Sequence, residues 1–224
     1  KVTLYDLNDK ILATKILKPG DLSITFEGGH KIDILENNRV IRSYTSKKDT
    51  SFKSWPGGPS PKMTLPHKQG FNRTHWDFRR EQLPSVDKVF VYGSYVGSTV
   101  APGTYSARLS YGQAVKEVSI EILPNPNLEY SAVDFNEQQQ LLVNIEEAIR
   151  KIHLSVSEMR GAQDQLKHYS KMLKGKAGFE SLYNNAVAIE KKLVEWEAQL
   201  IQPNQKTFQD VINFNNMLNA EFMH

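Results

Sequence analysis

The sequence predicts an α+β protein of two domains, an antiparallel β-sandwich followed by an α-helical hairpin or three-helix bundle. Three observations predict this fold class. Apolar residues alternate with period two before residue 127, and after it they recur every three or four residues. The stretch at 123–127 carries two prolines and separates the two patterns. We therefore expect a β-sandwich domain at 1–127 and a helical domain at 128–224.

The first half contains short β-rich runs bounded by turn residues. Asn8-Asp9-Lys10, Gly28-Gly29 and Asn37-Asn38 are suited to tight turns between strands. The strands predicted from this pattern lie at 1–5, 11–16, 23–26, 31–35 and 39–44. Short strands at this spacing are typical of an immunoglobulin- or fibronectin-like sandwich rather than a parallel sheet.

Two further strands are predicted around a Pro-Gly turn. The run GFNRTHWDFR at 70–79 is strand-like, and Pro102-Gly103 directly precedes an alternating run from Tyr105 to Tyr111. Proline fixes φ at the first central turn position and glycine accepts positive φ at the next, which predicts a tight turn. The strand-like run VKEVSIEIL at 115–123 then follows, while three prolines make 55–61 a loop.

The second half predicts two long helices. A period near 3.5 from Asp134, which can cap the start, predicts a first helix of about 40 residues. Gly175 and Gly178 mark the reversal into a second helix that ends before Pro203. The apolar stripe of that helix includes Trp196, which we expect in the core. Residues 207–224 are the predicted third partner, and the pattern at the last residues indicates a helical domain truncated at its C-terminus.

The heptad spacing leaves two arrangements open. An intermolecular coiled coil fits the stripe, but the short glycine-containing loop favours a hairpin that packs on itself.

Charge and composition exclude several function classes. Residues 1–127 carry 18 Lys and Arg against 12 Asp and Glu, and residues 128–224 carry 10 against 13. The basic residues are interspersed with acids, so we expect no nucleic-acid partner.

No apolar run approaches the roughly 20 residues of a membrane span. The chain has no cysteine, which excludes disulfides and thiolate sites.

Residues that carry catalytic or metal chemistry are scattered. The sequence lacks a phosphate-binding glycine loop, HExxH and GxSxG, and His67 and His75 are the histidines placed to meet in space. Asp77 is the one constrained carboxylate, whereas Glu146 and Glu197 are expected on solvated helix sides. We therefore predict no catalytic residue, no metal and no cofactor.

Three aromatic residues suggest carbohydrate binding. Trp55 lies in a Pro/Gly loop, and Tyr92 and Tyr95 follow in VYGSYVG, so their flat faces are candidates for contact with a sugar ring. The alternative is that all three pack structurally within the predicted sandwich.

The motifs together resemble the C-terminal region of bacterial sortilin-like, BNR-repeat proteins, many of which are labelled glycosyl hydrolases. The resemblance covers roughly residues 31–224, more weakly before Gly70. The residues that match its first element are Gly70, Asn72, Arg73, Trp76, Asp77 and Arg79, and those that match its second are Val100, Pro102, Gly103, Thr104 and Tyr105. The WD and PGTY elements are also similar to the immunoglobulin-like domain of flagellar hook-capping proteins. Pro124-Asn125-Pro126-Asn127 stands where the family has a D-P-R-like linker, which puts the family's interdomain salt link in doubt here.

The resemblance implies a non-catalytic accessory region that braces a preceding β-propeller and offers an interaction surface to another protein or a glycan. It also implies export, so we expect a periplasmic, cell-surface or secreted protein. Asn72, Arg73, Trp76 and Asp77 are then structural, and Pro102-Gly103 sets the strand register. Two alternatives remain, a carbohydrate-binding module and, less favoured, a glycoside hydrolase that uses Asp77.

Overall fold

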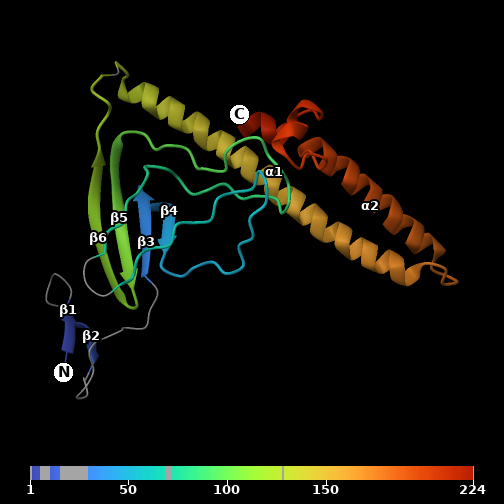
Figure 1. Ribbon diagram of the computed structural model, residues 1–224, viewed down its shortest axis with the longest axis horizontal. Coiled ribbons are helices and arrows are strands. Elements are labelled where there is room, and N and C mark those ends of the chain that lie inside the picture. The colour runs from blue at the N-terminus through green and yellow to red at the C-terminus, as the bar shows by residue number, and fades with distance from the viewer. Residues whose placement is uncertain (1, 6–10, 16–29, 69–71, 128, 224) are drawn as a thin grey trace. The chain divides into compact units, whose positions relative to one another are not determined.

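The computed structural model describes residues 2–5, 11–15, 30–68, 72–127 and 129–223 (Figure 1). Contacts between residues divide the chain into two compact units. The sheet unit comprises the described parts of Lys1–Phe52, Pro61–Glu81 and Thr99–Asn136. The helical unit comprises the described parts of Lys53–Ser60, Gln82–Ser98 and Glu137–His224.

The sheet unit contains an antiparallel sheet of four strands in the order β4-β3-β5-β6 (Figure 1). Its strands are β3 (His30–Glu36), β4 (Arg39–Thr45), β5 (Gly103–Tyr111) and β6 (Ala114–Ile122). A separate antiparallel pair is formed by β1 (Val2–Tyr5) and β2 (Ile11–Lys15). The predicted α+β class and the antiparallel pairing are confirmed, whereas the strand predicted at 23–26 lies outside the described residues.

Turn residues explain the two hairpins of the sheet. Asn37 and Asn38 adopt positive φ angles of 49° and 65° between β3 and β4, a conformation that asparagine tolerates better than most residues. Gly112, with φ of 57°, turns β5 into β6. In the resulting register Ile32 lies opposite Tyr44 on one side and Leu109 on the other.

Aromatic side chains form much of the core of the sheet unit. Tyr105 and Tyr44 are buried there with Ile34 and Val100, and Trp76 packs edge-on against Tyr105 with ring centroids 5.5 Å apart. The Tyr105 hydroxyl donates a hydrogen bond to the carbonyl oxygen of Ala101 at 2.7 Å. Burial, aided by the charge of nearby Glu36, raises the pKa of Tyr105 to about 12.

The structure corrects two predictions in this unit. Residues 72–79 form no strand, and within them Arg79 makes an isolated bridge with Thr99. The chain turns there because Phe78 has a φ of 56° and the Trp76 indole N–H donates to the carbonyl of Arg79 at 2.9 Å. Gly103 begins β5 without a positive φ, so the predicted Pro102-Gly103 turn is wrong although the strand after it is confirmed.

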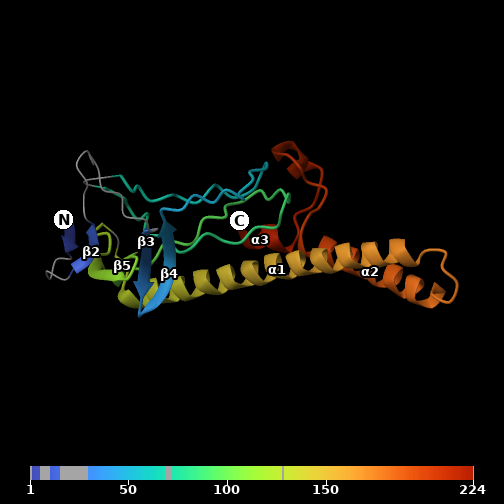
Figure 2. The same cartoon turned by 90° about the horizontal axis from the view of Figure 1, so that it is seen from below.

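The helical unit contains an antiparallel hairpin followed by two short helices (Figure 2). Its helices are α1 (Ala132–Leu173), which belongs to this unit from Glu137 onward, α2 (Glu180–Leu200), the 3-10 helix η1 (Phe208–Ile212) and α3 (Leu218–Met223). The reversal between α1 and α2 is as predicted, since Gly175 and Gly178 have φ of 75° and 84°. Residues 207–224, the predicted third partner, form η1 and α3 with irregular chain between them, and Ala220 of α3 belongs to the same core cluster as Ile149 and Val156 of α1.

Two side chains bond reciprocally to cap the start of α1. Asp134 contributes as predicted, but from inside the helix, where its carboxylate accepts a hydrogen bond from the Ser131 N–H at 2.7 Å. Ser131 precedes the helix, and its hydroxyl oxygen accepts from the Asp134 N–H at 3.3 Å. This reciprocal pair is a capping box, and the hydrogen bonds lower the pKa of Asp134.

The core of the helical unit includes a segment that precedes β5 in the chain. Residues 82–98, which we call the inserted segment, contribute Leu83, Val86 and Tyr95 to a cluster with Ile149 and Val156 of α1. This grouping differs from a division by sequence position alone, and the predicted domain boundary at 127/128 stays a prediction.

The buried face of α2 is rotated relative to the predicted one. Trp196 is 57% exposed, so its predicted place in the core is wrong, and the adjacent Glu197 is buried instead. Glu197 faces α1 because its carboxylate accepts hydrogen bonds from Arg160 at 2.8 Å and Gln163 at 3.2 Å.

Among the described helices, none combines the length and apolarity needed to cross a membrane.

Candidate functional site

Three polar side chains of α1 bind the backbone of the inserted segment. Glu146 accepts a hydrogen bond from the Ser98 N–H, His153 donates from Nδ1 to the Pro84 carbonyl at 2.7 Å, and Arg160 donates to the Asp87 carbonyl at 2.7 Å. They are spaced seven residues apart, which places them on one stripe of the helix. We call Glu146, His153 and Arg160 the α1 clamp.

His153 is the most buried member of the clamp, with 1% of its surface exposed. Because a carbonyl only accepts hydrogen bonds, Nδ1 carries the proton, and Nε2 faces the Asn219 side-chain amide nitrogen at 3.3 Å as an acceptor. Burial lowers the pKa of His153, and the hydrogen bond to Pro84 partly opposes this effect. The fold therefore favours the neutral form of this imidazole.

Tyr95 lies beside His153, with ring centroids 5.8 Å apart. Its hydroxyl is buried and has no hydrogen-bond partner in the part of the chain that the structure describes. Burial raises the pKa of Tyr95, so this phenol stays protonated.

Arg160 binds both the inserted segment and α2. Besides its bond to Asp87, its guanidinium forms an ion pair with Glu197 at 2.7 Å. Gln163 supplies a second donor to the same carboxylate. Removing Arg160 alone would leave the buried Glu197 carboxylate without its compensating charge, which is strongly destabilising.

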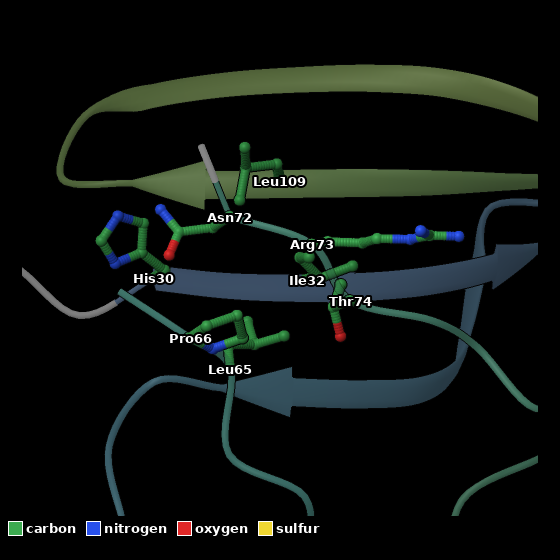
Figure 3. A pocket seen from close by; sticks show the side chains of 8 residues that line it. All are labelled: His30, Ile32, Leu65, Pro66, Asn72, Arg73, Thr74 and Leu109. Atoms are coloured by element: carbon green, nitrogen blue, oxygen red, sulfur yellow. The ribbon is translucent and has the colours of Figure 1, made fainter. Parts of the chain in front are cut away.

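The sheet unit has a pocket of about 270 Å³ on one face of the sheet (Figure 3). Its lining combines apolar and polar side chains, namely Ile32, Leu65, Pro66, Leu109, His30, Asn72, Arg73 and Thr74. In Figure 3 the imidazole of His30 and the amide of Asn72 lie at the same end of the pocket, and the Arg73 side chain extends toward the other end.

The polar groups of the pocket are held in different ways. The Asn72 amide exchanges two hydrogen bonds with the backbone of Lys68, at 2.8 Å and 3.0 Å, which fixes its orientation. The His30 ring stacks on Tyr111 with centroids 4.6 Å apart, and its Nδ1 is buried without a hydrogen-bond partner among the described residues. Chemically, the pocket offers an apolar floor and a rim that donates hydrogen bonds, a combination suited to binding a small polar molecule.

The structure separates the three residues predicted to contact carbohydrate by their exposure. Trp55 is half-buried, and its indole N–H donates to the Val89 carbonyl at 2.8 Å. Tyr95 is 4% exposed and belongs to the core, whereas Tyr92 is 46% exposed. Tyr92 is the most exposed of the three, and its ring makes a T-shaped contact with Phe208 at 6.0 Å between centroids.

The motif residues also fall into distinct environments. Asn72 and Arg73 line the pocket, whereas Trp76 packs against the core. Asp77 is exposed, and its carboxylate accepts a hydrogen bond from the Arg79 N–H at 3.3 Å. Gly70 lies outside the described residues. Across the described ranges, no three histidine, aspartate or glutamate side chains gather closely enough to hold a metal ion.

Sequence reasoning missed the clamp, and it placed one clamp member and one clamp partner wrongly. Glu146 and Glu197, expected on solvated helix sides, are engaged by Ser98 and Arg160. The available signal was the seven-residue spacing of Glu146, His153 and Arg160 next to the apolar stripe. The spacing alone does not reveal which segment binds there.

Comparison with known protein families, curated proteins and solved structures finds no match for this chain.

Proposed function

We propose that this chain is a non-catalytic accessory region, in which the helical hairpin holds the inserted segment and so forms a firm support for a neighbouring domain. The α1 clamp carries this proposal. Its side chains, of types that often do chemistry, direct their hydrogen bonds to backbone groups at Ser98, Pro84 and Asp87. Residues used in this way position the chain and have little capacity left for a substrate.

The neighbouring domain in this proposal is a β-propeller that precedes the chain in an exported, sortilin-like protein, located in the periplasm or at the cell surface. The sheet unit would be its immunoglobulin- or fibronectin-like module. The resemblance in the motif residues supports this, and the packing of Trp76 against Tyr105 fits a structural role for both residues.

The proposal is tested in a longer protein that carries the propeller. We expect the propeller to unfold at a higher temperature with this chain attached than without it. The double variant His153→Ala/Arg160→Ala should lose most of that increase, because it releases the inserted segment. The proposal would be contradicted if the propeller unfolded at the same temperature with and without this chain.

Carbohydrate binding is the second candidate function, and the pocket favours it. The Thr74 hydroxyl and the Arg73 guanidinium are groups that bind sugar hydroxyls, and the apolar floor suits a ring face. Calorimetric titration with a panel of glycans, repeated with Leu109→Trp to fill the pocket, separates this site from one at Tyr92. The third reading, a hydrolase, requires turnover of a polysaccharide that Asp77→Asn abolishes.

A further inference from the structure

The loop end of the α1–α2 hairpin carries an unusual concentration of positive charge. Residues 167–179 contain four lysines and no acidic residue, although residues 128–224 as a whole have more acidic than basic side chains. We call residues 167–179 the hairpin tip. Its lysines are Lys167, Lys171, Lys174 and Lys176, all exposed and all without an ion-pair partner in the described chain.

Large apolar side chains are exposed at the same end. Tyr169 and Met172 on the last turns of α1 are 57% and 50% exposed, and Phe179, just before α2, is 47% exposed. Ser170 and Leu173 occupy the seam positions of this stretch, so the exposed residues are not those that join the two helices. These three exposed side chains are therefore available for contact with another surface.

The tip is a well-formed convex end. The Lys174 N–H bonds to the Ser170 carbonyl at 3.0 Å, and the Lys176 N–H bonds to the Leu173 carbonyl at 3.0 Å. Gly175 and Gly178 supply the positive φ angles that this tight reversal requires. In both views the tip lies beyond the part of the hairpin beside η1 and α3, so these helices do not cover it (Figures 1 and 2).

The chemistry of the tip distinguishes among anionic partners. Surfaces that bind nucleic acid commonly provide a positively charged groove that follows the phosphate backbone. The tip has lysines only and is convex. Exposed Tyr, Met and Phe side chains within a group of lysines instead match the boundary between lipid headgroups and acyl chains, where apolar groups insert and cations contact anionic headgroups.

We propose that the hairpin tip docks on an anionic lipid surface, with Tyr169, Met172 and Phe179 entering the headgroup boundary and the four lysines contacting acidic headgroups. This inference goes beyond the brace, because it concerns the opposite end of the hairpin from the helix start and holds with or without a propeller. The hairpin would rest on the surface by its tip and not cross the bilayer.

Vesicle sedimentation with the whole chain tests this proposal. The chain should bind vesicles that contain phosphatidylglycerol and should not bind phosphatidylcholine alone. The triple variant Lys171→Gln/Lys174→Gln/Lys176→Gln should weaken binding on the order of a hundredfold, since a lysine near such a surface contributes about fivefold. Its matched control is Arg150→Gln/Lys151→Gln/Lys192→Gln, which removes three exposed charges from the helix bodies and should leave binding unchanged.

A second pair of variants examines insertion. Met172→Gln/Phe179→Ser keeps every charge, yet it should weaken binding at least tenfold, because the apolar contacts are lost. Its control, Val194→Gln on the exposed side of α2, should bind normally. Circular dichroism confirms that each variant keeps its helices.

Three results would overturn the proposal. The first is absence of binding to acidic vesicles by the folded chain. The second is binding that the triple lysine variant retains in full. The third is equal binding of heparin, RNA and acidic vesicles with no effect of Met172→Gln/Phe179→Ser, which identifies a non-specific cationic patch. These measurements do not test the accessory function proposed above, because they contain no propeller, so either proposal can fail without the other.

Discussion

At the scale of single residues, His153 makes the stability of the helical unit depend on pH. Its pKa is lowered in the fold because it is buried, whereas a histidine in an unfolded chain has a pKa of about 6.5. Below that pH the unfolded chain binds a proton more readily than the folded one. The stabilising contribution of the neutral imidazole is therefore present above about pH 6.5 and is lost as the pH falls toward the folded-state pKa.

Urea unfolding at about pH 7.5 and about pH 5 measures this dependence, and we expect a clear loss of stability at the lower pH. His153→Gln removes the titrating group while keeping a donor for Pro84, so its loss over the same interval should be smaller. His168→Gln, an exposed control on α1, should behave like the unchanged chain. Equal pH dependence in the His153→Gln and unchanged chains would show that the buried imidazole is not responsible.

At the scale of elements, two large apolar side chains near the C-terminal end of α2 should contribute very differently to stability. Ile201, at the end of α2, is completely buried, and Trp196 is more than half exposed. We expect Ile201→Ala to lower the free energy of unfolding by about 2–5 kcal/mol, because it leaves a cavity in the core. Trp196→Ala should cost about 1 kcal/mol or less.

Chemical denaturation followed by helical circular dichroism compares these two variants directly. Ala198→Gly, at a half-buried position of α2, removes no large side chain and gives a reference cost of about 1 kcal/mol for lost helix propensity alone. If Trp196→Ala proved the more damaging of the first two changes, the seam would follow the heptads of the sequence and not the face that contains Glu197.

The elements themselves were largely predictable because their causes are local. Asparagines at 37–38 and glycines at 175 and 178 indicate chain reversals, and periodicities of two and 3.5 indicate the strands and helices between them. The rotation of α2 was not predictable in this way. The helical period places Trp196 in the core by its residue type, whereas hydrogen bonds from Arg160 and Gln163, more than thirty residues away in the chain, hold Glu197 between α1 and α2.

Trp76 and Phe78 show the same limit in the sheet unit. Their spacing indicates a strand, but a hydrogen bond from Trp76 to the Arg79 carbonyl and the positive φ of Phe78 turn the chain instead. Of the candidate sites, the sequence singled out Asn72 and Arg73 as motif residues, and the structure places both at the pocket. It gave no indication that His30, from the start of β3, lies with them.

At the scale of the whole molecule, the chain passes between its two units more than once. The inserted segment at 82–98 lies between stretches of the sheet unit in sequence, yet its Leu83, Val86 and Tyr95 belong to the core of the helical unit. A sequence reading that follows residue order assigns this segment to the strands, because its alternating apolar residues carry no information about which element they pack against. We therefore expect the helices of residues 128–224 to need the inserted segment for stable folding.

A fragment of residues 128–224 tests that dependence. Without the inserted segment, Ile149, Val156 and His153 lose the partners that cover them, so the fragment should be helical but should melt with little cooperativity and bind a hydrophobic dye. A synthetic peptide of residues 82–98 should bind the fragment and restore a cooperative transition, whereas a scrambled peptide should not. The same peptide should bind the His153→Ala/Arg160→Ala fragment far more weakly, because two of its backbone carbonyls lose their donors. A fragment that unfolds cooperatively by itself, with the stability that the helices have in the full chain, would establish instead that residues 128–224 form a domain of their own.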